Sequence, residues 1–210
     1  MFGATETVSD QKTTRLGTGY FVTWVTDYLT QDGSLAGRQR FRVFRFAPGS
    51  ATRDGRPREP ERRPDRLAGV SGDPDQQAEI ELPAFTLDVT ATVIVAGAIA
   101  SRDFMPAHHH RDYAQGQGAP DIFMNILSDT GYCSRFLTDW AGPDAMIVRL
   151  AIRLGVPVHP GHTLTYTGQI TGLERKGAEG VVEVELRAMN ELGEHVGGTA
   201  TLNLPAGPRS

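Results

Sequence analysis

The chain has 210 residues, a net charge of −4 and 39% hydrophobic residues, a composition typical of an ordinary globular protein. No basic excess points to nucleic acid, and no apolar run reaches the roughly 18 residues that span a bilayer. Residues 1–14 lack the apolar core of a signal peptide, and the one cysteine, Cys133, rules out an intrachain disulfide. We therefore expect a cytoplasmic protein with neither a membrane nor a nucleic-acid function.

Residues 1–47 predict a small β element. The first 14 residues are polar, and we expect them to be frayed. Strand-forming residues fill 16–30, and Gln31-Asp32-Gly33 is a strong hairpin signal before a second strand. That strand alternates arginines with apolar or uncharged residues, as a half-buried strand requires: Arg38, Arg40 and Arg42. The arginine row is either a solvated face of the sheet or a phosphate-binding site, and both interpretations stay open.

Residues 48–79 interrupt this pattern. They mix charges of both signs with repeated prolines and hold no apolar cluster, which predicts a disordered linker. Acidic residues lie among the arginines, which argues against a nucleic-acid tail. We therefore expect three segments: a partial domain over 1–47, the linker over 48–79, and a full domain over 80–206.

The full domain predicts one long helix among strands. Strand and short-helix patterns occupy 85–92 and 93–102, and a long amphipathic helix is predicted over Asp121–Trp140. Strand signals follow at 145–154, 163–173, 181–189 and 196–204. One helix followed by consecutive antiparallel strands predicts an α+β fold, with the sheet wrapped round the helix. In this helical pattern Cys133 is expected to fill the core; a nucleophilic role is the lesser alternative.

A weak internal repeat links the two ends of the chain. Residues 190–202 resemble residues 31–41, since each is a turn between two strands with a glycine shortly into the second. The repeat indicates that 16–47 is the closing hairpin of a second, similar domain whose first half is absent. A chance similarity between two hairpins is the alternative.

Asp103 and His108 form the candidate reactive pair. Pro106 lies between them, prevents continuation of the preceding helix and biases Met105 towards an extended backbone. His108 can therefore turn back towards Asp103. A carboxylate beside an imidazole can hold and activate one water, or act with it as an acid/base pair. The alternative is a solvated loop whose three consecutive histidines, 108–110, bind a metal only adventitiously.

Ser101-Arg102-Asp103 and Pro106-Ala107-His108 together resemble the signature of the MaoC-like (R)-specific enoyl-CoA hydratases, which adopt the hotdog fold. Residues 121–131, 138–143 and 153–157 are similar to the small MaoC subunit of bacterial heteromeric hydratases of steroid side-chain enoyl-CoA esters. The resemblance covers about residues 80–205, whereas 16–47 resemble the end of the MaoC domain of the larger partner subunit.

The chain departs from the family signature at three positions. The family favours glycine, asparagine and an acidic residue where this chain has Arg102, Met105 and His110. Because Asp103 and His108 are retained, the departures bear on substrate range more than on reaction type.

The resemblance implies that Asp103 and His108 hydrate a trans-2-enoyl-CoA to a 3-hydroxyacyl-CoA. We expect backbone N–H groups of Asp121 and Ile122, at the start of the long helix, to stabilise the thioester oxyanion. No metal or redox cofactor is required. An exposed sheet edge and a half-open acyl site imply a homodimer, or a heterodimer with another MaoC protein.

Two alternatives remain. In the first, the chain is a non-catalytic subunit that completes the acyl pocket of a partner. In the second, it is a hotdog acyl-CoA thioesterase, whose acid on the central helix would be Asp129.

Overall fold

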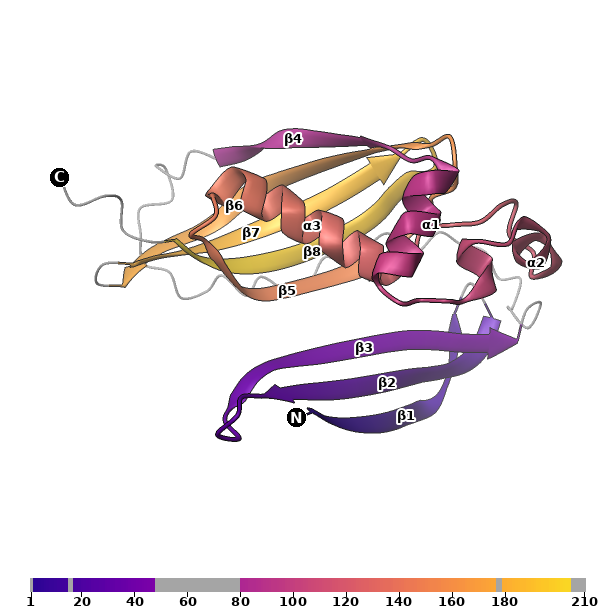
Figure 1. Cartoon of the computed structure of the whole chain (residues 1–210), viewed down its shortest axis with the longest axis horizontal. Helices are drawn as coiled ribbons and strands as arrows, with labels where there is room; N and C mark the ends of the chain where they lie inside the picture. The colour runs from indigo at the N-terminus through magenta and orange to yellow at the C-terminus, as the bar shows by residue number, and fades with distance from the viewer. Residues whose placement is uncertain (1, 15–16, 48–79, 177–178, 205–210) are drawn as a thin grey trace. The chain divides into compact units, whose positions relative to one another are not determined.

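The computed structural model describes residues 2–14, 17–47, 80–176 and 179–204, so the predicted linker lies outside the described residues. The chain divides into two compact units, Met1–Ser71 and Gly72–Ser210, and each is described by itself (Figure 1). None of the helices in the described ranges is long and apolar enough to cross a membrane.

The first unit is a three-stranded antiparallel sheet in the order β1 (Phe2–Thr14), β2 (Gly17–Leu29) and β3 (Leu35–Ala47). The expected hairpin is confirmed, with Gly33 at φ 85° in the turn. The expectation of a frayed N-terminus is wrong, because β1 pairs with β2 along its length. The β-branched residues Thr5, Thr7 and Val8 favour a strand here despite the polar composition.

Two arginines of the β3 row, Arg38 and Arg42, contact side chains of β2. Arg38 pairs with Asp27 at 2.5 Å. The Nε–H of Arg42 donates to the Thr23 hydroxyl at 2.9 Å, and its guanidinium lies over the Phe21 ring. All three arginines of the row are exposed. These contacts favour a solvated sheet face over a phosphate site.

The second unit is a five-stranded antiparallel sheet that curves round one long helix, which confirms the α+β prediction (Figure 1). The strand order is β4-β6-β7-β8-β5. The strands are β4 (Ile80–Asp88), β5 (Met146–Leu154), β6 (Thr163–Lys176), β7 (Glu179–Asn190) and β8 (Gly193–Leu204). The helical elements are α1 (Ala91–Ala100), the 3-10 turn η1 (Pro106–His108), α2 (Arg111–Gly116) and the long helix α3 (Ile126–Ala141).

The long helix begins later than predicted. Asn125 is its N-cap and Ile126 its first residue, so the predicted start at Asp121 is wrong. The backbone just before the cap is held by other segments, since the N–H of Met124 donates to the carbonyl of Val158 at 3.1 Å. Gly142, at φ 88°, ends the helix at the predicted place.

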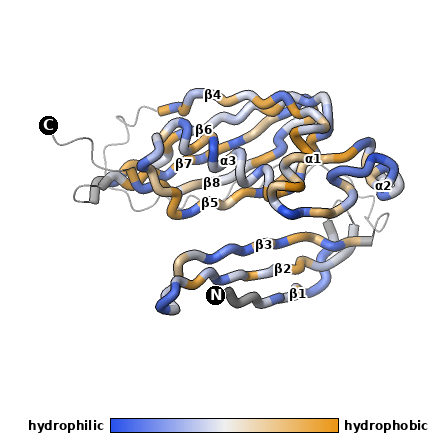
Figure 2. Tube along the Cα trace, viewed as in Figure 1, coloured by the Kyte–Doolittle hydropathy of each residue, from blue (hydrophilic) through white to orange (hydrophobic). Residues whose placement is uncertain are grey.

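The core lies between α3 and the concave face of the sheet. Cys133, Phe136 and Leu137 are at most 2% exposed and pack with Tyr166 and the apolar residues of β7 and β8. Hydrophobic and hydrophilic residues alternate along these strands (Figure 2), as a sheet with one buried face requires. Burial raises the pKa of the Cys133 thiol to about 12, which favours core filler over nucleophile.

Replacement of the fully buried Leu186 by alanine is expected to lower the free energy of unfolding by about 2–5 kcal/mol, because it leaves a cavity under α3. Leu173→Ala, at a residue 69% exposed on the same sheet, is the control and should change it by about 0.5 kcal/mol or less. Urea unfolding measures both; equal losses would contradict the core described here.

Candidate active site

The structure brings Asp103 and His108 together at the end of α1. Arg102 adopts a left-handed conformation, φ 57°, and reverses the chain so that the N–H of Asp103 donates to the carbonyl of Ala98. Pro106 then opens η1, which ends at His108. His108 Nε2 lies 3.5 Å from Asp103 Oδ2, with side chains 9% and 27% exposed respectively. The two groups therefore face one another at an opening to solvent.

The backbone fixes which nitrogen of His108 carries the hydrogen. Nδ1 lies 2.7 Å from the carbonyl oxygen of Phe123. A carbonyl oxygen only accepts, so Nδ1 must donate. In the neutral ring, Nε2 then presents its lone pair towards Asp103 and can serve as a base. The Phe123 ring meets the imidazole edge-on at 5.0 Å and packs one side of it.

Asn125 links Asp103 to the start of α3. Its Oδ1 accepts from the N–H of Ser128 at 3.0 Å, which caps the helix. Its Nδ2 group donates to Asp103 Oδ2 and to the Ser101 hydroxyl, both at 2.9 Å. Sequence reasoning missed this residue, although an asparagine directly before an apolar periodic run is an N-cap signal.

The backbone of residues 122–124 is hydrogen-bonded to two other segments, the loop between β5 and β6 and the turn that contains Ala107. His159 Nδ1 donates to the carbonyl of Ile122 at 3.0 Å, one residue before the carbonyl that holds His108. The N–H groups of Phe123 and Met124 donate to the carbonyls of Ala107 and Val158. The loop between β5 and β6 thus supports the backbone on which His108 is oriented.

Comparison with known proteins identifies the family of the chain. No family model matches the chain. It is 44% identical over 123 residues to the 3-oxo-4,17-pregnadiene-20-carboxyl-CoA hydratase beta subunit of Mycobacterium tuberculosis, a match spanning 59% of this chain and 92% of that relative. The chain belongs to the MaoC-like enoyl-CoA hydratase family.

Solved structures agree on the hotdog fold. The ChsH1–ChsH2 complex from Mycobacterium tuberculosis matches at TM-score 0.57 and 43% identity, over 60% of this chain and 96% of that chain. R-hydratase PhaJ1 from Pseudomonas aeruginosa matches at TM-score 0.55 and 19% identity, over 60% and 81%. A MaoC-like dehydratase matches at TM-score 0.65 and 19% identity, over 96% of this chain and 69% of that chain.

In this MaoC-like chain Asp121 and Ile122 do not belong to the helix N-terminus, so that part of the oxyanion prediction is wrong. The N–H of Ile122 donates to the carboxylate of Asp121 at 2.7 Å. Asp121 also pairs with Arg111 at 2.6 Å, and this hydrogen bond holds the pKa of Asp121 below its usual range. The first N–H groups of an α-helix have no partner within the helix, and in α3 the first two are those of Ile126 and Leu127.

Asp129 is fully buried, at 0% exposure, in a hydrogen bond with His195. The distance from Asp129 Oδ1 to His195 Nε2 is 2.9 Å, and His195 Nδ1 donates to the carbonyl of Val156 at 2.6 Å. This burial separates Asp129 from any thioester in solvent and argues against the thioesterase alternative.

Asp129 and His195 both have raised pKa values. Burial raises the pKa of Asp129, opposed by the hydrogen bond from His195. For His195 burial alone would lower the pKa, but its hydrogen bond to Asp129 and the Asp129 charge outweigh it and raise the pKa.

Among the described residues, no group of three or more His, Cys, Asp or Glu side chains could hold a metal ion. His110 does not join His108, because its Nδ1 accepts from the N–H of Tyr113 and caps α2.

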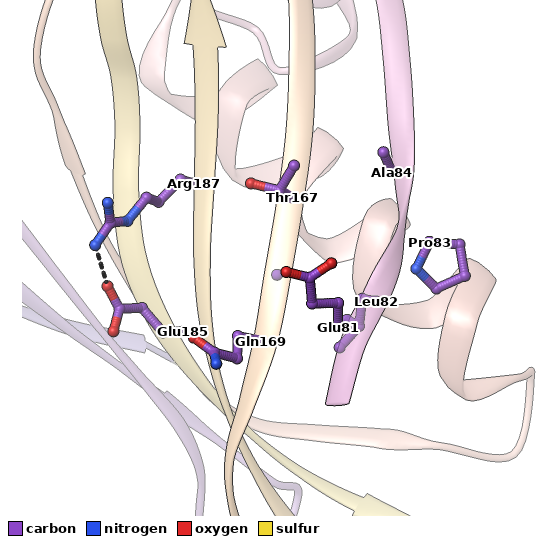
Figure 3. Close-up of a pocket in the computed structure, with 9 residues that line it drawn as sticks. Glu81, Leu82, Pro83, Ala84, Thr167, Gln169, Glu185 and Arg187 are labelled. Carbon is purple, nitrogen blue, oxygen red and sulfur yellow. Dashed lines mark hydrogen bonds and ion pairs between the residues drawn. The ribbon is translucent and has the colours of Figure 1, made fainter. Parts of the chain in front are cut away.

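Two grooves border the second unit. The first, about 720 Å³, lies on β4, β6 and β7 and is lined largely by polar residues, including the Arg187–Glu185 pair (Figure 3). It occupies the sheet face opposite the core, and neither Asp103 nor His108 lines it. The second, about 370 Å³, lies between α1 and α3 and includes Ser101, the partner of Asn125.

The buried pair predicts how stability depends on pH. The pKa values of Asp129 and His195 are both raised on folding, so the contribution of each group is present below its own ordinary pKa, 3.8 for Asp129 and 6.5 for His195, and is lost as pH rises through its raised value. Cys133 and Tyr166 beside the pair have raised pKa values and stay protonated in this window.

Urea unfolding of the native protein at several pH values from 6.5 upwards should show this loss, and the double variant Asp129→Asn/His195→Gln should show a flatter profile. Identical profiles for the two proteins would contradict the raised pKa values.

Proposed function

We propose that this chain hydrates trans-2-enoyl-CoA thioesters to 3-hydroxyacyl-CoA, with Asp103 and His108 activating the water. The observation that carries this proposal is the facing of His108 Nε2 and Asp103 Oδ2 at 3.5 Å. At this separation one water can bond to both atoms, and the Phe123 carbonyl keeps the Nε2 lone pair free to accept its proton.

The reaction adds H and OH across the C2–C3 double bond. The water oxygen bonds to C3 as His108 Nε2 takes its proton, and the π electrons move to C2 and the thioester carbonyl. The ionised Asp103, hydrogen-bonded by Asn125, orients the water and stabilises the imidazolium. His108 then returns the proton to C2, so no proton or electron is gained or lost overall.

The negative charge on the thioester oxygen needs fixed donors. In place of Asp121 and Ile122, we assign this role to the first turn of α3, where the N–H groups of Ile126 and Leu127 lie beside the Asn125 cap. This turn begins directly after Asn125, the residue that holds Asp103. The N-terminal end of α3 would therefore both position the carboxylate and stabilise the thioester oxyanion.

We infer a bulky acyl group and a second MaoC protein as partner. The 44% identical relative is named for a pregnadiene carboxyl-CoA, and the 43% identical structure is a complex of two proteins. The chain matches that relative over 92% of its length, which supports a similar role for the second unit.

Asp103→Asn and His108→Gln should each lower kcat for enoyl-CoA hydration by about a hundredfold or more, because each removes one side of the water site. His109→Gln and Asp112→Asn, exposed in the same segment, are the controls and should leave kcat unchanged. The assay follows loss of the enoyl-thioester absorbance by the folded assembly with its partner. Full activity of Asp103→Asn would favour a non-catalytic subunit, and release of free CoA thiol would favour a thioesterase.

The variant Asn125→Ser should distinguish the helix-capping role of Asn125 from its contact to Asp103. Serine keeps an N-cap acceptor but cannot supply the Nδ2 donor, so stability should stay near that of the native protein while kcat falls about tenfold or more. Asn125→Ala should in addition lower the free energy of unfolding by about 1 kcal/mol. Urea unfolding and initial rates measure the two effects; an unchanged kcat in Asn125→Ser would contradict the positioning role of Asn125.

A further inference from the structure

The Phe123 ring lies between two imidazole rings. It meets the His108 ring edge-on at 5.0 Å and the His159 ring edge-on at 6.3 Å. The two imidazoles also make the same kind of hydrogen bond to neighbouring residues. His108 Nδ1 donates to the carbonyl of Phe123 at 2.7 Å, and His159 Nδ1 donates to the carbonyl of Ile122 at 3.0 Å. His108 and His159 are therefore coupled through two consecutive carbonyls and one shared ring.

His159 is fixed in a tight turn before β6. Its backbone N–H donates to His162 Nδ1 at 3.3 Å, and its carbonyl accepts from the N–H of His162 at 3.2 Å. Val89 anchors this turn, since its N–H donates to the carbonyl of His162 at 2.9 Å and its carbonyl accepts from the N–H of Gly161 at 2.7 Å. Because Val89 belongs to the buried core, the turn gives the His159 imidazole little freedom to move.

The surroundings of His159 favour one protonation state of its ring. The residue is buried, and its Nε2 atom has no hydrogen-bond partner among the described residues. The carbonyl oxygen of Ile122 only accepts, so Nδ1 carries a hydrogen. A second hydrogen on Nε2 would bury a positive charge without an acceptor, which is strongly unfavourable. The ring is therefore neutral in this arrangement and has its hydrogen on Nδ1.

The hydrogen bond from His159 bears on the tautomer of His108. Without it the peptide group of Ile122 would lose this donor, and the backbone could rotate so that the Phe123 carbonyl turns away from His108 Nδ1. The tautomer of His108 with its hydrogen on Nε2 would then become accessible. In that tautomer Nε2 has no lone pair to accept a proton from water.

We propose that His159 is a positioning residue for the reactive pair. By donating to the Ile122 carbonyl it directs the Phe123 carbonyl at His108, and so it determines which nitrogen of His108 carries the hydrogen. His159 acts through this backbone and not on the reacting atoms. Its effect on the rate rests on the proposed function, whereas its effect on the His108 tautomer does not.

Two substitutions separate the donor of His159 from its ring. His159→Phe keeps a ring against Phe123 and loses the donor, whereas His159→Asn loses the ring and keeps an N–H group at the place of Nδ1. We expect His159→Phe to lower kcat about tenfold or more with KM changed less than about twofold, and His159→Asn to stay within about threefold of the native kcat. Initial rates of enoyl-CoA hydration by the assembly with its partner measure this.

His162→Phe is the matched control for these rates. It is the same change three residues along the turn, at a ring that packs on His159 at 5.7 Å, and it should leave kcat unchanged. A His159→Asn protein no faster than His159→Phe would overturn the proposal, because ring packing and not the hydrogen bond would then determine the rate.

Nitrogen NMR of isotope-labelled histidine tests the assignment without turnover. In the native protein His159 should show a protonated Nδ1 and an unprotonated Nε2, and this measurement needs no folded variant. In His159→Phe the His108 signals should shift towards the tautomer with hydrogen on Nε2, and in His159→Asn they should stay as in the native protein. A native His159 with its hydrogen on Nε2, or an unchanged His108 tautomer in His159→Phe, would overturn the proposal. The expected shift in an assembly that hydrates no enoyl-CoA would support the positioning role and contradict only the proposed function.

Discussion

The side-chain amide of Asn125 connects the start of α3 to Asp103 and to the end of α1 at the candidate active site. Its oxygen caps α3 through the N–H of Ser128, and its nitrogen donates to Asp103 and to Ser101 at the end of α1. A single planar group therefore fixes the helix start, the carboxylate and the chain reversal relative to one another. An apolar residue here would leave a helix N–H without its cap, and the Asp103 carboxylate would keep only the 3.4 Å hydrogen bond from the Met105 N–H.

The second support is the backbone that precedes the cap. His159 and His108 donate to the successive carbonyls of Ile122 and Phe123, and Val158 accepts from Met124. Val156, in the same loop, accepts from His195, whose other nitrogen bonds to Asp129 of α3. Hydrogen bonds from β8 and the β5–β6 loop thus support the backbone whose Phe123 carbonyl holds the His108 imidazole.

Local rules made part of this architecture predictable. Pro106 determines the backbone between Asp103 and His108, so their approach follows from five residues of sequence, and the alternating strands and long helix indicated the fold. The helix start was mispredicted because Ile122 continues the apolar period, whereas Met124 next to it bonds to Val158, far along the chain. Asp129 and His195, 66 residues apart, carry no local signal of their pairing. Strand β1 was missed because its pairing with β2, not its composition, determines its structure.

The Phe123 carbonyl holds His108 with its hydrogen on Nδ1, which leaves the Nε2 lone pair free to accept a proton. Nitrogen NMR of isotope-labelled histidine at mildly alkaline pH tests this directly, with the His108 signals assigned by their absence in His108→Gln. We expect a protonated, pyrrole-type Nδ1 and an unprotonated, pyridine-type Nε2. A neutral His108 with the hydrogen on Nε2 would contradict it, because that nitrogen could not then act as the base.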